Sequence, residues 1–279
     1  MTGVQTCALP IYLKNYYKDN LAPNISKLII VGDVNKETIL PKLGFLKNWT
    51  SERVIGRRWE FTPPAITKTK LYLVNKEKSA QSEIRIGYMA LSYDPFGDYY
   101  KNIIVNYPLG GAFNSRINMN LREAKGWTYG ARSGFVGGKY DGRFSAAAGV
   151  KLNATDSSIV EFMKEIKMYA AGGIKQEELD FSKKAILQSD ALRFESPEQK
   201  AYFLKRLVDF SLDAEYIKKQ NEILKAITKQ DVDALAAKYL PYNNMDIVVV
   251  GDKAKIYEGL VKLGYEIVEL DMNGNPVVK

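Results

Sequence analysis

An internal repeat with a long period constrains the fold of this chain more than any other feature of its sequence. The tripeptide Val-Gly-Asp at residues 31–33 recurs 219 residues later, at residues 250–252. Each copy lies in the same order of features: a helix end, a turn with Pro and Asn, a buried apolar strand, Val-Gly-Asp, a short helix and Lys-Leu-Gly-aromatic. This period is the size of a domain and not of a solenoid unit. We therefore expect two homologous domains in tandem.

The repeat sets the expected domain boundaries. Residues 12–50 correspond to the terminal part of a truncated first domain, and residues 65–279 to a complete second domain. Residues 51–64, which are basic and contain proline, are expected to link the two. Residues 1–11 lack the charged and apolar regions of a signal peptide and match nothing that follows. We interpret them as a non-native junction or a disordered tail, and leave them out of the fold prediction.

The first half of the second domain is expected to be rich in strands. Alternating or continuous apolar residues predict strands at residues 71–76 and 82–90. Residues 98–109 predict a helix that ends at Gly110 and Gly111. A second helix is expected from Ala112 to Ala124, with an apolar face made of Phe113, Ile117 and Leu121. Two further strands are expected on either side of the glycine-rich turn 137–142.

The second half is expected to be mostly helical. Thr155 and Asp156 start one helix, Ser196 and Pro197 start another, and Thr228 caps a third, while a long amphipathic helix begins near residue 177. The strand Met-Asp-Ile-Val-Val-Val, residues 245–250, then returns to the sheet. Strands, a helical block and a final strand predict an α+β fold, a mainly antiparallel sheet with helices packed on one face.

Composition excludes several classes of protein. The net charge is +8, but 40 basic residues are dispersed among 32 acidic ones, so we expect no nucleic-acid partner. No apolar run approaches the roughly 20 residues that span a bilayer, so we expect no membrane span. We expect a soluble protein of the bacterial periplasm or cytoplasm. The single cysteine, Cys7, cannot form an internal disulfide, and the chain has no histidine.

Arg122 and Tyr129 are the candidate binding residues. If Arg122 lies in the last turns of a helix and Tyr129 on the strand beyond Gly126, both side chains can reach the same side of a surface. A guanidinium offers a fixed fork of donors for carbonyls or a carboxylate, and a phenol offers one more donor. Both groups stay protonated near neutral pH, so neither supplies a nucleophile or a general base. Such a pair holds and polarises a peptide but does not cleave it.

The spacing alone leaves other interpretations open. Arg122 can instead be a solvated helix residue paired with Glu123 or Asp98, and Tyr129 can simply fill a strand position. Gly110 and Gly111 can let a peptide backbone approach closely, or can simply stop a helix.

The wider segment favours the first interpretation. Residues 109–135 read LGGAFNSRINMNLREAKGWTYGARSGF, and over about twenty positions this string is closely similar to the M16 (insulinase, pitrilysin and processing-peptidase) family. The Val-Gly-Asp repeats, the GGI-x-x-E-E-L helix start at residues 172–179 and the final strand resemble the same family. The resemblance extends from residue 12 to about residue 252.

The resemblance implies a repeated α+β domain of the LuxS/MPP-like kind, arranged as two lobes. In active members one lobe holds zinc through an H-x-x-E-H motif and a distant glutamate, and the opposite lobe supplies an Arg/Tyr pair that holds the peptide. With no histidine this chain cannot contain that motif, so it resembles the C-terminal, zinc-free half. The acid pairs Glu177–Glu178 and Glu161–Glu165 do not replace it, because zinc prefers nitrogen and sulfur ligands.

These features predict the substrate-binding half of an M16-type zinc metalloendopeptidase, inactive by itself. Arg122 and Tyr129 are its expected substrate-binding residues, with Gly110 and Gly111 near the substrate; we expect no catalytic residue and no metal site in this chain. Its expected partners are a peptide or unfolded protein and a zinc-bearing half, in the same polypeptide or a separate subunit. The alternative is a non-proteolytic M16-like scaffold or assembly subunit. A third, weaker interpretation is a basic surface that binds acidic partners.

Overall fold

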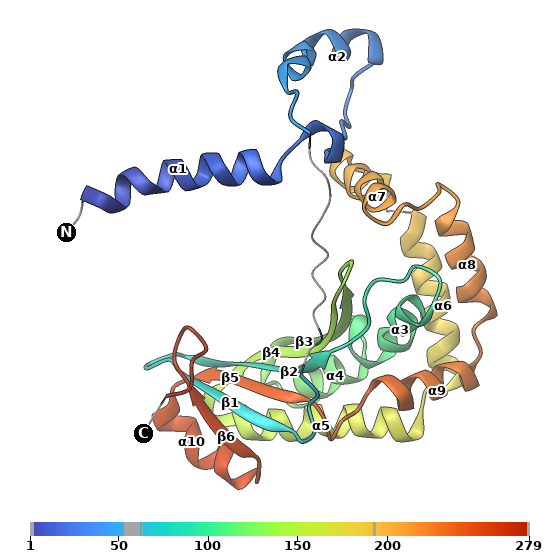
Figure 1. The fold of residues 1–279 in the computed structure, drawn as a ribbon. Coiled ribbons are helices and arrows are strands. Elements are labelled where there is room, and N and C mark those ends of the chain that lie inside the picture. The colour runs from blue at the N-terminus through green and yellow to red at the C-terminus, as the bar shows by residue number, and fades with distance from the viewer. Residues whose placement is uncertain (1–2, 53–61, 63, 192–193, 278–279) are drawn as a thin grey trace. The chain divides into compact units, whose positions relative to one another are not determined.

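A computed structural model describes residues 3–52, 62, 64–191 and 194–277 (Figure 1). These residues fall into two compact units, which we describe separately. One contains Met1–Trp59 and Asp190–Ala214, and the other contains Glu60–Ser189 and Glu215–Lys279. The expected linker, residues 51–64, lies largely outside the described residues, and the expected domain boundaries stay a prediction.

The larger unit is built on one six-stranded sheet. Strands β3, β4, β2 and β5 pair antiparallel in that order, and β1 then pairs in parallel with both β5 and β6. The parallel part arises because helix α10 connects β5 to β6 across β1. The strands are β1 (Lys70–Asn75), β2 (Gln81–Met89), β3 (Thr128–Gly137), β4 (Gly142–Lys151), β5 (Asp246–Gly251) and β6 (Glu266–Leu270).

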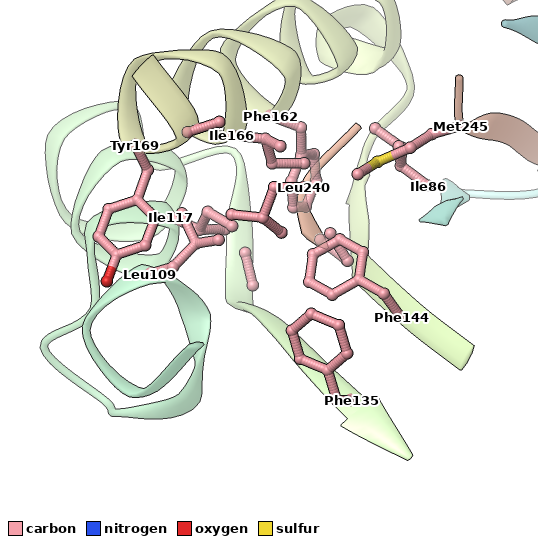
Figure 2. Close-up of a cluster of buried hydrophobic side chains, with 14 of the residues drawn as sticks. Ile86, Leu109, Ile117, Phe135, Phe144, Phe162, Ile166, Tyr169, Leu240 and Met245 are labelled. Carbon is pink, nitrogen blue, oxygen red and sulfur yellow. The ribbon is translucent and has the colours of Figure 1, made fainter. Parts of the chain in front are cut away.

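Helices of the same unit cover one face of this sheet, as the sequence predicts. Helix α5 runs along that face (Figure 1). Its side chains Phe162 and Ile166 pack with Ile117 and Phe144 in the core (Figure 2). The helices are α3 (Asp98–Asn106), α4 (Arg116–Asn118), α5 (Thr155–Gly172), α6 (Gln176–Ala191), α8 (Tyr216–Ala226), α9 (Lys229–Tyr239) and α10 (Lys253–Lys262). The expected α+β fold, a mainly antiparallel sheet with helices on one face, is confirmed.

Local signals in the sequence locate most helix ends correctly. Helix α9 begins after Thr228, which forms a capping box with Asp231, and α7 (Pro197–Phe210) begins after Ser196, which forms one with Gln199. Helix α5 ends at Gly173, whose φ is +70°. Helix α8 and strand β6 were not among the expected elements. Within the described residues, no helix is long and apolar enough to cross a membrane.

The expected helix from Ala112 to Ala124 is wrong in part. Helix α3 continues into a π-helical turn, Tyr107–Gly111, which ends where the Ala112 N–H donates to the Tyr107 carbonyl (2.9 Å). A loop follows, and only then come α4 and a second π-helical turn, Met119–Ala124. Phe113 lies in that loop and is 70% exposed, so it is not part of the buried face. The Phe113 carbonyl accepts a hydrogen bond from the Asn118 side chain (2.6 Å), which stabilises the loop.

The smaller unit departs from the strand predicted before the first Val-Gly-Asp. It contains α1 (Gly3–Asn20), α2 (Lys36–Lys42), α7 and two 3₁₀ turns, Pro23–Ile25 and Gly44–Asn48. Residues 26–31 form no strand in this described part, and Leu28 is exposed. Their counterpart β5 pairs with β1 and β2, whereas residues 26–31 have no adjacent strand in their unit. Helix α1 includes residues 3–11, whose assignment as a non-native or disordered tail stays a prediction.

Candidate functional site

The structure places the candidate residues Gly110, Gly111, Arg122 and Tyr129 around a single hollow of about 290 Å³. The hollow lies beside strand β3, at the edge of the sheet. Two π-helical turns supply one side of it, and β3 supplies the other. Its remaining lining residues are Ala112, Phe113, Asn118, Gly130, Ala131, Arg132 and Ser133.

Arg122 lies on the second π-helical turn, Met119–Ala124, and its side chain is one-third exposed. One guanidinium nitrogen lies 3.5 Å from a Glu123 carboxylate oxygen, and the guanidinium carbon lies 4.5 Å from the centre of the Phe113 ring. The ion pair with Glu123 is the one considered from sequence, whereas Asp98 instead pairs with Lys238 and Tyr239. Because a guanidinium carries five N–H donors, this single distant contact leaves most of them available to a ligand.

Tyr129 projects from a β-bulge at the start of strand β3. The register between β3 and β4 shifts between Thr128 and Ala131, and Tyr129 is 90% exposed. The Thr128 hydroxyl fixes the bulge, since it donates to the Gly149 carbonyl (2.7 Å) and accepts from the Gly130 N–H (3.1 Å). Within the described residues the Tyr129 hydroxyl has no hydrogen-bond partner. Bulges re-aim side chains next to binding sites, and this one presents a free phenol beside the hollow.

Buried asparagines hold the two sides of the hollow together. Asn118 accepts from the Ala131 N–H (3.0 Å), in addition to its bond with Phe113. Asn106 donates to the Ser133 carbonyl (2.7 Å) and accepts from the Ser133 hydroxyl. Neither asparagine was among the site residues expected from the sequence. They could have been found as polar residues at positions that the helical pattern predicts to be buried, since a buried polar group needs a hydrogen-bond partner.

Arg116, the arginine of the Ser-Arg pair in the same segment, is a structural residue. Its guanidinium forms two hydrogen bonds with the Glu178 carboxylate (2.8 and 2.6 Å), and it lies 4.8 Å from the Tyr169 ring centre. Burial alone would raise the pKa of Glu178, but the hydrogen bonds from Arg116 and from the Lys175 N–H hold it below its usual value. This pair joins α4 to α6, so it fixes the helical side of the hollow.

The donor groups of this chain do not fit a zinc site. The sequence has no histidine and one cysteine. Across the described ranges, no group of three or more Asp, Glu or Cys side chains is placed to hold a metal ion. Glu161 and Glu165 both accept hydrogen bonds from Asn120 (2.7 Å each), which explains their spacing as a structural feature.

Comparison with known proteins identifies the family. Residues 12–186 match the family described as the peptidase M16 inactive domain. A Helicobacter pylori protein named non-peptidase homolog YmxG is 25% identical over 236 residues, which are 83% of this chain and 53% of that protein.

Solved structures share the fold. A peptidase M16 inactive domain from Pseudomonas fluorescens superposes with a TM-score of 0.65 and 22% identity, covering 79% of this chain and 52% of that one. The first half of the periplasmic protease PqqL from Escherichia coli superposes with a TM-score of 0.67 and 14% identity, covering 90% and 56%. The chain thus spans about half the length of these relatives. It belongs to the peptidase M16 family, through the domain that the family description calls inactive.

Proposed function

We propose that this chain is the substrate-binding half of an M16-type zinc metalloendopeptidase, and that Arg122 and Tyr129 hold an extended peptide while a zinc-bearing half supplies the metal and the general base. One observation carries the proposal: a partly free guanidinium and an exposed phenol lie at the same hollow, on supports that hydrogen bonds make rigid. Hydrogen-bond donors that are already held in place lose little conformational entropy when they bind a carbonyl, so a rigid pair suits substrate binding.

The chemistry of the hollow allows binding and polarisation. The Arg122 guanidinium donates to one or two peptide carbonyls, and the Tyr129 hydroxyl donates to a neighbouring one. Phe113 packs under the guanidinium and orients it. Among the residues that the structure describes, no histidine, cysteine or carboxylate lines the hollow to act as a base, so we expect this chain alone to leave peptides intact.

The comparisons support a second half without identifying it. The chain covers 56% of the first half of PqqL, a periplasmic protease, and a comparable share of the Pseudomonas protein. A zinc-bearing partner, covalent or separate, and a peptide or unfolded-protein substrate therefore belong to the proposal. A periplasmic or cytoplasmic location also belongs to it.

The test is a reconstituted cleavage assay. The chain is mixed with a purified zinc-bearing M16 half, and hydrolysis of a fluorogenic peptide is followed with the native chain, Arg122→Ala and Tyr129→Phe. We expect kcat/KM to fall about 10- to 100-fold in each variant, which corresponds to the loss of one or two charge-assisted or oxyanion-type hydrogen bonds. Lys218→Gln, an exposed change on α8, is the matched control and should have no effect. Equal turnover in all four chains would remove the proposed roles of both residues.

A scaffold role is the second candidate, because the Helicobacter pylori relative is named a non-peptidase homolog. A scaffold would associate with its partner without contributing to cleavage. It is favoured if the chain binds the zinc-bearing half in analytical ultracentrifugation but neither Arg122→Ala nor Tyr129→Phe changes hydrolysis.

A further inference from the structure

Small residues are concentrated on the sheet face that the helices of the larger unit leave uncovered; the surface that these small residues form is called the floor. Side chains on this face, here called the open face, alternate with the buried ones along each strand. In one row across three strands, Gly134 of β3 pairs with Ser145 of β4, and Ser145 pairs with Gly87 of β2. Ala147 continues the floor along β4. Four small residues in one area, two of them glycines without a side chain, leave room for a ligand to lie close to the sheet.

Gly134 indicates that this room is not a by-product of packing. A Cβ atom built at Gly134 would meet nothing within 4 Å, and its φ lies outside the left-handed region. Neither space nor backbone conformation therefore requires a glycine there, although glycine weakens a strand interior. The remaining effect of a glycine at this position is to keep the surface of the sheet free of a side chain.

Three exposed arginines surround this floor. Arg132 and Arg85 lie on either side of Ala147 in one row, and Arg143 lies four residues before Ala147 on β4. A hollow of about 550 Å³ takes in Arg85 and Arg143 and also contains Asp246.

Two of these arginines are available to an anionic ligand. Arg85 already pairs with Glu83 (3.0 Å), and Asp246 experiences the positive charge of Lys70. In the part of the chain that the structure describes, Arg132 and Arg143 have no carboxylate within 4.0 Å. Among the described residues, the open face therefore presents two arginines that have no carboxylate partner. Arg132 also lines the hollow of Arg122 and Tyr129.

A peptide could also bind by adding a strand to an edge of the sheet, but the outer edge of β3 is partly covered. Along β3 the Ala131 N–H donates to Asn118, the Ser133 carbonyl accepts from Asn106, and the Gly137 N–H donates to the Tyr99 hydroxyl (3.1 Å). These bonds occupy several of the backbone groups that an added strand would need.

The opposite edge is occupied at its end. Along β6, Leu270 forms a bridge with Pro276, and the Val277 N–H donates to the Glu269 carbonyl (2.9 Å). Both edges are thus partly covered, and the open face is the surface that Arg132 joins to the hollow.

We propose that the open face selects acidic side chains of the bound peptide through Arg132 and Arg143, an inference that rests on the proposed role of Arg122 and Tyr129 in holding that peptide. Arg132 pairs with Ala147 of β4, and Arg143 lies on β4 itself, four residues before Ala147, so the two arginines are about 13 Å apart along the strand direction. In an extended peptide, residues four apart face the same side at the same separation of about 13 Å. The favoured substrates are extended peptides with two acidic residues at positions i and i+4.

The test compares three fluorescein-labelled peptides of Ser and Thr by anisotropy with the full chain. One carries Glu at i and i+4, the second carries Gln at those positions, and the third carries Glu at i and i+3, which face opposite sides. We expect the first to bind about fivefold more tightly than either control at low salt, as two exposed charge pairs allow, and the difference to shrink at high salt. Arg132→Gln and Arg143→Gln should each weaken the first peptide more than the second. Arg143→Gln, a change outside the lining of the hollow of Arg122 and Tyr129, should leave the second unchanged.

Two further variants separate this inference from the proposed function. Arg122→Ala should weaken all three peptides by the same factor, and Gly134→Val, which fills the floor, should weaken all three while the chain stays folded. Equal affinity for the three peptides, with Arg122→Ala still weakening them, would overturn acidic selection and leave the proposed function standing. Absence of binding by every peptide would overturn both. Acidic preference that survives Arg132→Gln and Arg143→Gln would refute the assignment to these residues.

Discussion

Two arginines of one short segment serve different purposes, and their partners decide which. Arg116 has a bidentate carboxylate partner and a neighbouring ring, so it is fully engaged in the fold. Arg122 has one ion pair, at 3.5 Å to Glu123, and lies over the Phe113 ring, so most of its N–H donors remain available. Arg116 and Arg122 therefore differ in how a glutamate is placed. Glu178 binds two nitrogens of the Arg116 guanidinium, whereas Glu123 lies near the limit of an ion pair with Arg122. Tyr129 gains its role in a similar way, from a bulge that leaves its hydroxyl free.

Gly110 and Gly134 provide a residue-scale prediction. A Cβ at Gly110 would overlap the Ser133 hydroxyl and N–H, whereas one at Gly134 would meet nothing within 4 Å. Gly110→Ala should therefore lower the free energy of unfolding by about 1–3 kcal/mol, because the β3 side of the hollow must shift. Gly134→Ala should leave the free energy of unfolding unchanged or raise it by up to about 1 kcal/mol, because glycine weakens a strand interior. Urea unfolding followed by circular dichroism measures both, and equal stability of the two variants would contradict the packing argument.

At the scale of elements, irregular structure positions the site. Both π-helical turns and the bulge of β3 surround one hollow, while the regular helices and strands form the core beneath. Glu178 connects the irregular elements around the hollow to the regular helices, because its carboxylate on α6 binds Arg116 on α4. The support of the hollow thus depends on a carboxylate outside the candidate segment.

The pH dependence of stability tests that connection. The pKa of Glu178 is lowered in the folded state, so its contribution is present above about pH 4.5, the usual glutamate value, and is lost as the pH falls below it. Glu178→Gln should cost about 1–2 kcal/mol at pH 7 and should make the acid limb of the stability curve shallower. Glu177→Gln, a change at the exposed neighbour, is the control and should follow the native curve. Parallel acid limbs for the native chain and Glu178→Gln would show that the ion pair adds no stability.

At the scale of the whole molecule, the chain carries two copies of one motif in different states. The second copy forms β5, which has a neighbouring strand on each side, and is followed by α10. The first copy, residues 26–31, forms no strand among the described residues, although α2 follows it as α10 follows β5. The same local sequence pattern forms a strand only where a sheet is available.

Hydrogen exchange measures this difference directly. Amides of residues 247–250 should exchange slowly, because they lie in the centre of the sheet, and amides of residues 28–31 should exchange within seconds. If residues 28–31 complete a sheet of the proposed partner half, adding that half should slow their exchange and leave residues 247–250 unchanged. Slow exchange of residues 28–31 in the chain alone would contradict their unpaired state.

The sequence was informative wherever structure depends on neighbours along the chain. Ser196, Thr228 and Gly173 end or begin helices through contacts within a few residues, so their patterns were sufficient. Phe113 was misassigned because apolar spacing alone does not show that the chain leaves the helix at this point, in a loop that the side chain of Asn118, five residues later, stabilises. The strand expected before the first Val-Gly-Asp was wrong for a different reason. Residues 26–31 have the apolar pattern of a strand, but no strand lies beside them among the described residues of their unit.

By itself, the sequence determined the family, the α+β class, the segment that carries Arg122 and Tyr129, and the lack of zinc-binding histidines in this chain. Motifs and missing residue types can be read without coordinates, because they depend on identity and spacing alone. Only the tertiary structure decided which side chains remain free, where the hollow lies, and that Arg132 and Arg143 flank a floor of small residues. These properties depend on strand register, burial and partners far away in the sequence, which no local pattern encodes.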